Sequence, residues 1–212
     1  MNIPRSEVYR YLGYRGHTPD DDVIRLVEDS LTALSAAEPH HILRRLPLTV
    51  TDTAVTVGGL RVESAKLCQH LRGCDEGFLF AATLGATADR LIRRGGRLDM
   101  SRAVILQASA AAMLEAYCDE VQDALAADLR REGKYLRPRF SPGYSDFPLS
   151  FQQPLLDLLE AAKRLSLTLT DGCMLVPTKS VTAIIGITAD ASRCHTHHCA
   201  ACDKADCPFR KG

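Results

Sequence analysis

The chain has 212 residues and a formal net charge of zero, from 26 basic and 26 acidic residues. This balance argues against an electrostatic nucleic-acid binder, which needs a surplus of positive charge. Apolar residues make up 46% of the chain, enough for a core, but no uncharged run approaches the length of a membrane span. Because the N-terminus has no apolar signal segment, we expect a cytoplasmic protein whose eight cysteines are thiols or metal ligands.

The first part of the chain predicts two helices followed by a group of strands. A short helix is expected over residues 4–13, and a second begins near Thr18, which is placed to cap it. The aspartates that follow favour the positive end of a helix dipole, and one apolar face repeats over residues 23–34. Between residues 41 and 63 the apolar residues alternate instead, which predicts strands around a turn at residues 58–59.

The middle of the chain predicts mostly helices. A short helix over residues 64–71, a buried strand over 77–83 and a helix over 85–95 precede a long helix from about residue 101 to residue 131. The apolar stripe of this long helix consists of Val104, Ala108, Ala111, Cys118, Leu125 and Leu129. Glu115 interrupts the stripe on the side that we expect to be buried.

A turn built around one arginine follows the long helix. Pro138 and Pro142 fix the backbone, and Gly143 permits a left-handed or close approach. Arg139 supplies a planar, permanently charged fork that suits a carboxylate. A turn this stiff is typical of a ligand site. The alternative interpretation is a linker between helices that carries a surface arginine.

Beyond the turn, Ser150 and Gln153 predict a capping box for a helix that extends to about residue 164. Two strands are then expected, over residues 165–170 and 180–188. Together the elements predict an α+β fold, in which an antiparallel or mixed sheet packs around a long central helix.

The composition changes near residue 190, so we divide the chain into a domain, residues 1–190, and a Cys/His-rich tail, residues 191–212. The tail contains four cysteines within a short stretch: Cys194, Cys199, Cys202 and Cys207. An iron–sulfur cluster is favoured by their spacing and by the proline after the last of them. Structural zinc is favoured equally, with four thiolates or with tail histidines as ligands, and an unligated tail is the third alternative.

Glu115 requires a partner, because burying a bare carboxylate costs several kcal/mol. A structural arginine is one candidate partner, and the ammonium group of a ligand is the other. An arginine fork and a sequestered carboxylate together are what a zwitterionic amino-acid group requires. Arg139 and Glu115 therefore form the candidate site from local chemistry alone.

The sequence Arg139-x-x-x-Gly143-Tyr144 resembles the S-adenosylmethionine-binding motif of the reactivation domain of cobalamin-dependent methionine synthase. The segment 174–186 is similar to the Pro-x-x-Ser-Val strand of that domain. Residues 8–16 are similar to the opening of its free-standing versions. The resemblance thus extends over nearly all of the predicted domain, and the arginine turn is its most specific part.

The resemblance implies a role for each matching residue. Arg139 would bind the methionyl carboxylate, and Glu115 would face the amino group. Ser141 would help to hold the nucleoside end, Gly143 would let the backbone approach the ligand, and Tyr144 would pack or hydrogen-bond against it. The family also has a tyrosine after the Ser-Val strand, where this chain has none. Either another residue covers the cofactor or the affinity is lower.

The implied function is reductive reactivation, in trans, of methionine synthase or a related corrinoid methyltransferase, with S-adenosylmethionine as methyl donor and a low-potential electron donor. A sulfonium methyl is already activated, so the reaction needs positioning and no general base. The corrinoid is expected on a partner protein, because the only His-x-x-Gly here, His70 to Gly73, has Cys68 where the corrinoid motif has aspartate. A non-catalytic adaptor and an iron–sulfur electron carrier are the alternatives.

Overall fold

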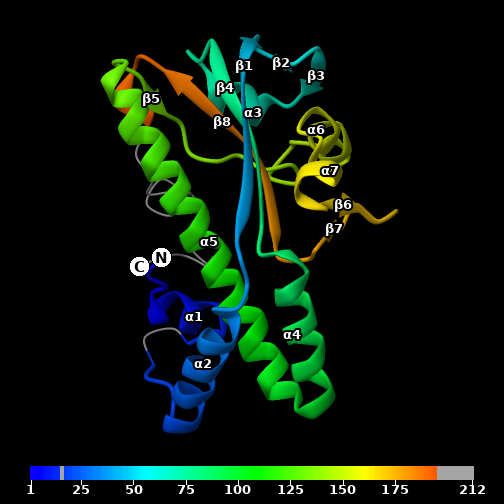
Figure 1. The fold of residues 1–212 in the computed structure, drawn as a ribbon. Helices are drawn as coiled ribbons and strands as arrows, with labels where there is room; N and C mark the ends of the chain where they lie inside the picture. Colours follow the sequence, from blue (N-terminus) through cyan, green and yellow to red (C-terminus); the bar gives the residue numbers. More distant parts are fainter. Residues whose placement is uncertain (15–16, 195–212) are drawn as a thin grey trace.

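The computed structural model describes residues 1–14 and 17–194 (Figure 1). Within these residues, six strands form one sheet in the order β3-β2-β1-β4-β8-β5. Its strands are β1 (His40–Val50), β2 (Ala54–Val57), β3 (Leu60–Glu63), β4 (Glu76–Thr83), β5 (Tyr135–Leu136) and β8 (Ser180–Thr188). Every pairing in this sheet is antiparallel, which confirms the predicted α+β class and selects the antiparallel alternative.

Helices cover both faces of the sheet. They are α1 (Arg5–Tyr11), α2 (Asp21–Leu34), α3 (Ala65–Leu71), α4 (Gly85–Leu98), α5 (Met100–Arg131), α6 (Gln152–Leu158) and α7 (Ala161–Leu165). The short elements are the hairpin of β6 (Thr168–Leu169) and β7 (Leu175–Val176) and the 3-10 helices η1 (Leu149–Phe151) and η2 (Ala191–Arg193). Figure 1 shows α1, α2 and α4 beside the first half of α5, whereas α6 and α7 lie away from it.

The central strands β4 and β8 are buried on both faces, so their apolar residues are consecutive rather than alternating. On β4, Leu79 belongs to the core formed with α3 and α6, whereas its neighbour Phe80 belongs to the core formed with α4 and α5. The strands predicted over residues 77–83 and 180–188 are thus confirmed. The sheet separates two hydrophobic layers, and the long helix lies on only one side of it.

The long helix predicted over residues 101–131 is α5, and its bounds agree closely with the prediction. Its buried face is rotated relative to the predicted stripe, because Val104 is 52% exposed while Ile105 is buried. The helix packs against α1, α2, α4 and the sheet, so it is covered from several directions rather than along one stripe. Glu115 consequently lies at the edge of the buried face, with 39% of its side chain exposed.

The predicted cap of the second helix was wrong by two residues. The side chain of Asp20, not that of Thr18, accepts a hydrogen bond from the N–H of Val23 at 2.9 Å. Asp20 directly precedes the first helical residue, and a carboxylate there also favours the positive end of the dipole.

The predicted capping box after the turn was also wrong. Ser150 lies inside the 3-10 helix η1, and α6 begins without a side-chain cap. The Gln153 amide instead donates to the carboxylate of Asp157, one turn further along the helix (2.8 Å). Glu160, with φ of 52°, then divides the predicted single helix into α6 and α7. Of the strand predicted over residues 165–170, only the two residues of β6 form.

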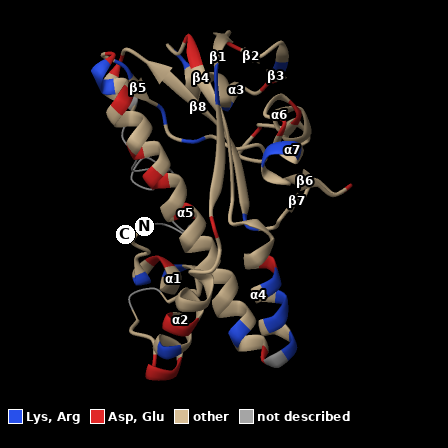
Figure 2. Cartoon of the chain, viewed as in Figure 1, with Lys and Arg blue, Asp and Glu red and all other residues tan. Residues whose placement is uncertain are grey.

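Charge is unevenly distributed over the surface (Figure 2). Basic residues gather along the outer side of α4, whereas acidic residues mark α2 and the second half of α5. Across the described segments, no helix combines the length and the apolar character that a bilayer-crossing helix needs.

Candidate functional site

The arginine turn begins as an extension of the sheet. After β5 the chain continues beside β8, where the N–H of Arg137 donates to the carbonyl of Gly186 at 2.8 Å. Further along, Phe140 and Ile184 exchange two backbone hydrogen bonds of 3.0 and 2.9 Å. The start of the turn is therefore held by a central strand of the sheet.

This extension contains one extra residue relative to β8. Three residue steps lead from Arg137 to Phe140, but only two lead from Gly186 to Ile184 on the facing strand. Such a bulge re-aims the side chains that follow it. Pro138 lies within it, and a proline, which has no N–H, suits a bulge better than a regular ladder. As a result Arg137 faces α3, whereas Arg139 faces α5.

The turn itself is closed by its own backbone. The N–H of Gly143 donates to the carbonyl of Phe147 at 2.9 Å, and the N–H of Tyr144 donates to that of Ser141 at 3.1 Å. Gly143 has φ of +91°, which confirms the left-handed backbone predicted for this position. Ser141 thus contributes its carbonyl to the turn, and its predicted contact with a nucleoside stays a prediction.

One side of the turn is anchored in the hydrophobic core. Phe147 is buried and lies against the rings of Phe140 and Phe151, with centroids 6.1 and 5.3 Å away. Asp146 accepts hydrogen bonds from the Ser64 hydroxyl (2.5 Å) and from the N–H of Lys66 (3.2 Å) at the start of α3. The hydrogen bonds from the Ser64 hydroxyl and from the backbone N–H of Lys66 hold the pKa of Asp146 below its ordinary value.

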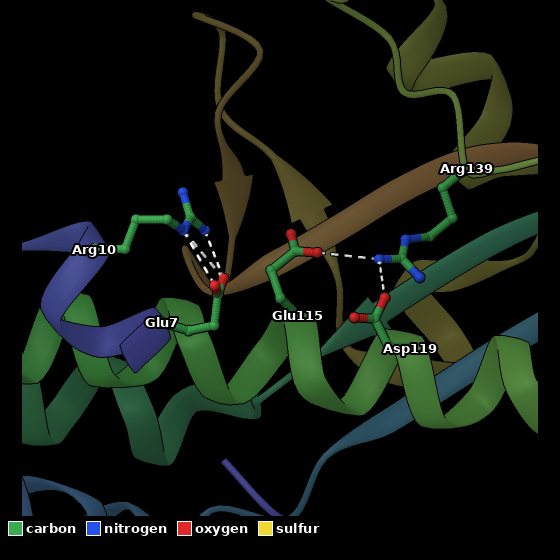
Figure 3. A network of polar contacts seen from close by, with 5 residues as sticks. All are labelled: Glu7, Arg10, Glu115, Asp119 and Arg139. Carbon is green, nitrogen blue, oxygen red and sulfur yellow. Dashed lines mark hydrogen bonds and ion pairs between the residues drawn. The ribbon is translucent and has the colours of Figure 1, made fainter. Parts of the chain in front are cut away.

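The other side of the turn carries Arg139, which reaches three side chains of α5. Its Nη2 donates to Asp119 at 2.7 Å and to Glu115 at 3.0 Å (Figure 3). Its Nη1 donates to Gln122 at 3.1 Å. Only 14% of the Arg139 side chain is exposed. Burial opposes its charge, yet Cys118, Asp119 and Glu115 together raise the pKa of this guanidinium above its ordinary value.

The structure thus brings together the two residues that the sequence analysis paired. A guanidinium has five N–H donors, and three of those of Arg139 are engaged by α5. The other two have no acceptor among residues 1–14 and 17–194. The carboxylates of Glu115 and Asp119 keep 39% and 54% of their side-chain surface exposed. Both signs of charge therefore remain accessible at one point.

Two tyrosines flank this charge pair from different elements. Tyr144 is 58% exposed, and its ring lies edge-on to Phe140 with centroids 6.0 Å apart. Partial desolvation of the hydroxyl and the nearby Glu115 carboxylate raise the pKa of Tyr144. Burial and the same carboxylate also raise the pKa of Tyr11 at the end of α1. The charge of Glu115 therefore acts on one tyrosine of α1 and on one tyrosine of the turn.

An acidic groove adjoins Glu115 and Asp119, the two carboxylates that Arg139 contacts. It encloses about 570 Å³ between the N-terminal segment and α5, and neither Arg139 nor the turn lines it. Its carboxylates are Glu7, Glu115, Asp119, Glu120 and Asp123. Figure 3 shows Glu7, Glu115 and Asp119 in a row, with Arg10 at one end and Arg139 at the other. The lining carries more acidic than basic groups, although the Met1 ammonium, which also lines the groove, lies 4.0 Å from Glu120.

A family model described as the activation domain of vitamin B12 dependent methionine synthase matches residues 74–211. This chain belongs to that activation-domain family. The resemblance that the arginine turn indicated is thereby confirmed at the level of the family. No curated protein matches the chain.

A solved structure has a fold similar to that of this chain. The crystal structure of the MetH reactivation domain bound to AdoHcy matches with a TM-score of 0.64 over 87% of this chain and 73% of the other. The two sequences are 17% identical, so the likeness concerns the fold. The predicted likeness of the whole architecture to the methionine synthase activation domain is confirmed.

The predicted metal site of this activation domain falls largely outside the described residues, which end at Cys194. Cys199, Cys202 and Cys207 lie beyond that point, and the thiol of Cys194 donates to the carbonyl of Asp190 at 3.3 Å. Among the residues that the structure describes, no group of three or more His, Cys, Asp or Glu side chains could hold a metal ion. The metal site of the tail stays a prediction.

Two residues of the arginine network, Asp119 and Gln122, were not predicted from the sequence. They follow Glu115 by four and seven positions, which is the spacing of one helix face. A search for polar residues in register with Glu115 would have found them.

Proposed function

We propose that this activation domain binds S-adenosylmethionine beside Arg139 and presents it to a corrinoid held by a partner. The observation that carries the proposal is the contact between Arg139 and Glu115, whose side chains meet at 3.0 Å from a turn and a helix 24 residues apart in sequence. Family membership supports the same function.

The charges at the site match those of the proposed ligand. S-adenosylmethionine carries a carboxylate, an ammonium and a sulfonium. An uncommitted N–H group of Arg139, on Nε or Nη1, can donate a charge-assisted hydrogen bond to the carboxylate. Glu115 and Asp119 can receive the ammonium, and the acidic groove beside them favours the positive sulfonium.

The turn supports the proposal through its rigidity. Gly143 brings the backbone round the ligand, Ser141 is proposed to face the nucleoside, and Tyr144 offers an exposed ring to pack on it. Because sheet hydrogen bonds and a buried Phe147 fix the turn in advance, little ordering is required when a ligand binds. When bound, the sulfonium supplies an already activated methyl group, so the chain needs only to orient it.

The corrinoid is proposed to belong to another polypeptide or domain, because these 212 residues lack the Asp-x-His-x-x-Gly motif. A low-potential donor must supply the electron that reactivation consumes. We propose further that residues 191–212 form a separate tail in which Cys194, Cys199, Cys202 and Cys207 bind an iron–sulfur cluster or zinc. Metal analysis after anaerobic purification distinguishes the two, since a cluster is brown and zinc is colourless.

A single-turnover assay tests the function. S-adenosylmethionine labelled in its methyl group is mixed with an oxidised corrinoid methyltransferase and titanium(III) citrate, with and without this chain. We expect label on the corrinoid protein only when the chain is present, and at least about a tenfold slower transfer with Arg139→Ala. Arg44→Ala, an exposed arginine on β1 that bonds the carbonyl of Leu158, is the matched control and should leave the rate unchanged.

Two results would contradict the proposal in different ways. Equal labelling without the chain shows that it is not the methyl-presenting component. Faster reduction of the corrinoid protein without any label transfer favours the adaptor or electron carrier. The absence of the family tyrosine near Arg193 and Cys194 is the observation that keeps that second candidate.

A further inference from the structure

Four arginines form a stripe on α4 that the proposed function does not use. Their spacing of three, one and three residues places them on one face of the helix. They are Arg90, Arg93, Arg94 and Arg97, and all four are exposed. Figure 2 shows this basic stripe along the outer side of α4. We call it the arginine stripe.

The opposite face of α4 is engaged in the core. Ala88 and Ile92 are buried there with residues of α5 and the sheet. Gly95 lies so close to α5 that an added Cβ would come within 2.7 Å of the Leu106 side chain. The helix is therefore fixed in orientation, and the arginine stripe points away from the rest of the molecule.

The charges of the stripe are not neutralised within the described part of the chain. No carboxylate among the described residues lies within ion-pair distance of the four guanidinium groups. Arg90 donates a hydrogen bond to the hydroxyl of Thr87 at 2.8 Å. The one acid of this helix, Asp89, is engaged by Thr178 instead (2.7 and 2.9 Å). Like charges three and four residues apart destabilise a helix, so the stripe opposes the stability of α4.

We propose that the arginine stripe is a docking surface for an acidic protein, whose Asp and Glu side chains pair with its guanidinium groups. Arginine forks bind carboxylates in a two-pronged geometry that suits protein interfaces. Met100 and Val104, at the start of α5 and the same end of the molecule, are 71% and 52% exposed and can contribute apolar contacts.

Two other polyanions fit the stripe less well. A nucleic-acid binder would need a surplus of positive charge, and the whole chain has a formal net charge of zero. A membrane surface would require the apolar face of the helix, which α5 already covers. The arginine stripe lies on α4, whereas the side chains that Arg139 contacts lie on α5, so no residue belongs to both sites.

A labelled helical peptide with four glutamates at the spacing of the arginine stripe tests the proposal by fluorescence anisotropy. We expect it to bind the full chain with an affinity that falls as ionic strength rises. Arg93→Glu with Arg94→Glu should weaken binding at least about tenfold. Lys163→Glu with Arg164→Glu, two exposed residues on α7, make the same change in net charge and should have little effect. Circular dichroism verifies that both variants fold.

Additional controls test whether another kind of ligand binds the arginine stripe. A peptide of the same composition with scrambled glutamate positions should bind more weakly than the patterned one. Equal loss of binding in both double variants would overturn the proposal, since the attraction would then be a property of net charge. Tighter binding of duplex DNA or of anionic lipid vesicles to the stripe would also overturn it, as would self-association of the chain that Arg93→Glu with Arg94→Glu abolishes.

Discussion

Arg137 and Arg139 are two residues apart and lie in opposite environments. Arg137 is 2% exposed, and one of its nitrogens donates to the carbonyl of Arg72 at 3.2 Å. Its Nε and Nη1 are buried without a hydrogen-bond acceptor among the described residues. Arg139 is partly exposed and makes three hydrogen bonds to α5. The same type of side chain therefore packs in the core at position 137 and pairs with carboxylates of α5 at position 139.

The difference between the two arginines results from one extra residue. In a regular strand, residues two apart point to the same side, so both arginines would face the same layer. The bulge around Pro138 breaks that rule and turns Arg139 toward Glu115. The turn therefore has a core side, with Arg137 and Phe147, and a proposed ligand side, with Arg139 and Tyr144. Substitutions on the two sides should have different consequences.

The largest expected effect is on the core side of the turn. Phe147→Ala removes a ring that is 1% exposed and should lower the free energy of unfolding by about 3–5 kcal/mol. Tyr144→Ala, three residues away on the proposed ligand side and 58% exposed, should change it by about 0.5 kcal/mol or less. Urea unfolding of both variants measures the difference. Equal losses would mean that the turn does not have two distinct sides.

A smaller effect is expected where Arg137 packs on β8. A Cβ at Gly186 would lie 2.7 Å from the Cys74 sulfur and 2.7 Å from a methyl carbon of Leu71. Gly186→Ala should therefore cost about 1–3 kcal/mol in thermal or urea unfolding. Gly96→Ala is the matched control, because its Cβ would meet only Ala103 at 3.6 Å. If Gly186→Ala is tolerated as well as the control, the side chains of Cys74 and Leu71 can move aside and the core side of the turn is not tightly packed.

Cys118 is buried beside the Arg139 network. Burial raises the pKa of this thiol to about 12. The folded state keeps the proton while the unfolded thiol ionises from about pH 9, so stability is lost as pH rises from 9 toward 12. The loss approaches at most about 1.4 kcal/mol per pH unit. Cys118→Ala should unfold with a shallower alkaline dependence, and an unchanged dependence would show that the thiol is not protected.

Much of the site could be predicted from the sequence because its signals are local. The length of α5 follows from its apolar spacing, the left-handed backbone follows from Gly143, and the pairing of Glu115 with Arg139 follows from charge and burial. The bulge could not be predicted, because it depends on how the segment pairs with β8, which is more than forty residues further along the chain.

Competing local signals account for the other differences. Thr18 and Asp20 are both good capping residues, and only the position of the first helical turn decides between them. Ser150 and Gln153 have the spacing of a capping box, but the 3-10 helix η1 occupies the place where the cap would form. The strands β5, β6 and β7 have only two residues each. Their position depends on the strand with which each one pairs, and not on the β-propensity of its own residues.

The most direct test of the central claim is a binding cycle by calorimetry with S-adenosylmethionine and its decarboxylated analogue. If Arg139 binds the ligand carboxylate, Arg139→Ala should weaken S-adenosylmethionine by about tenfold to a hundredfold and leave the affinity for the analogue unchanged. Equal weakening of both ligands, or of neither, would contradict the assignment.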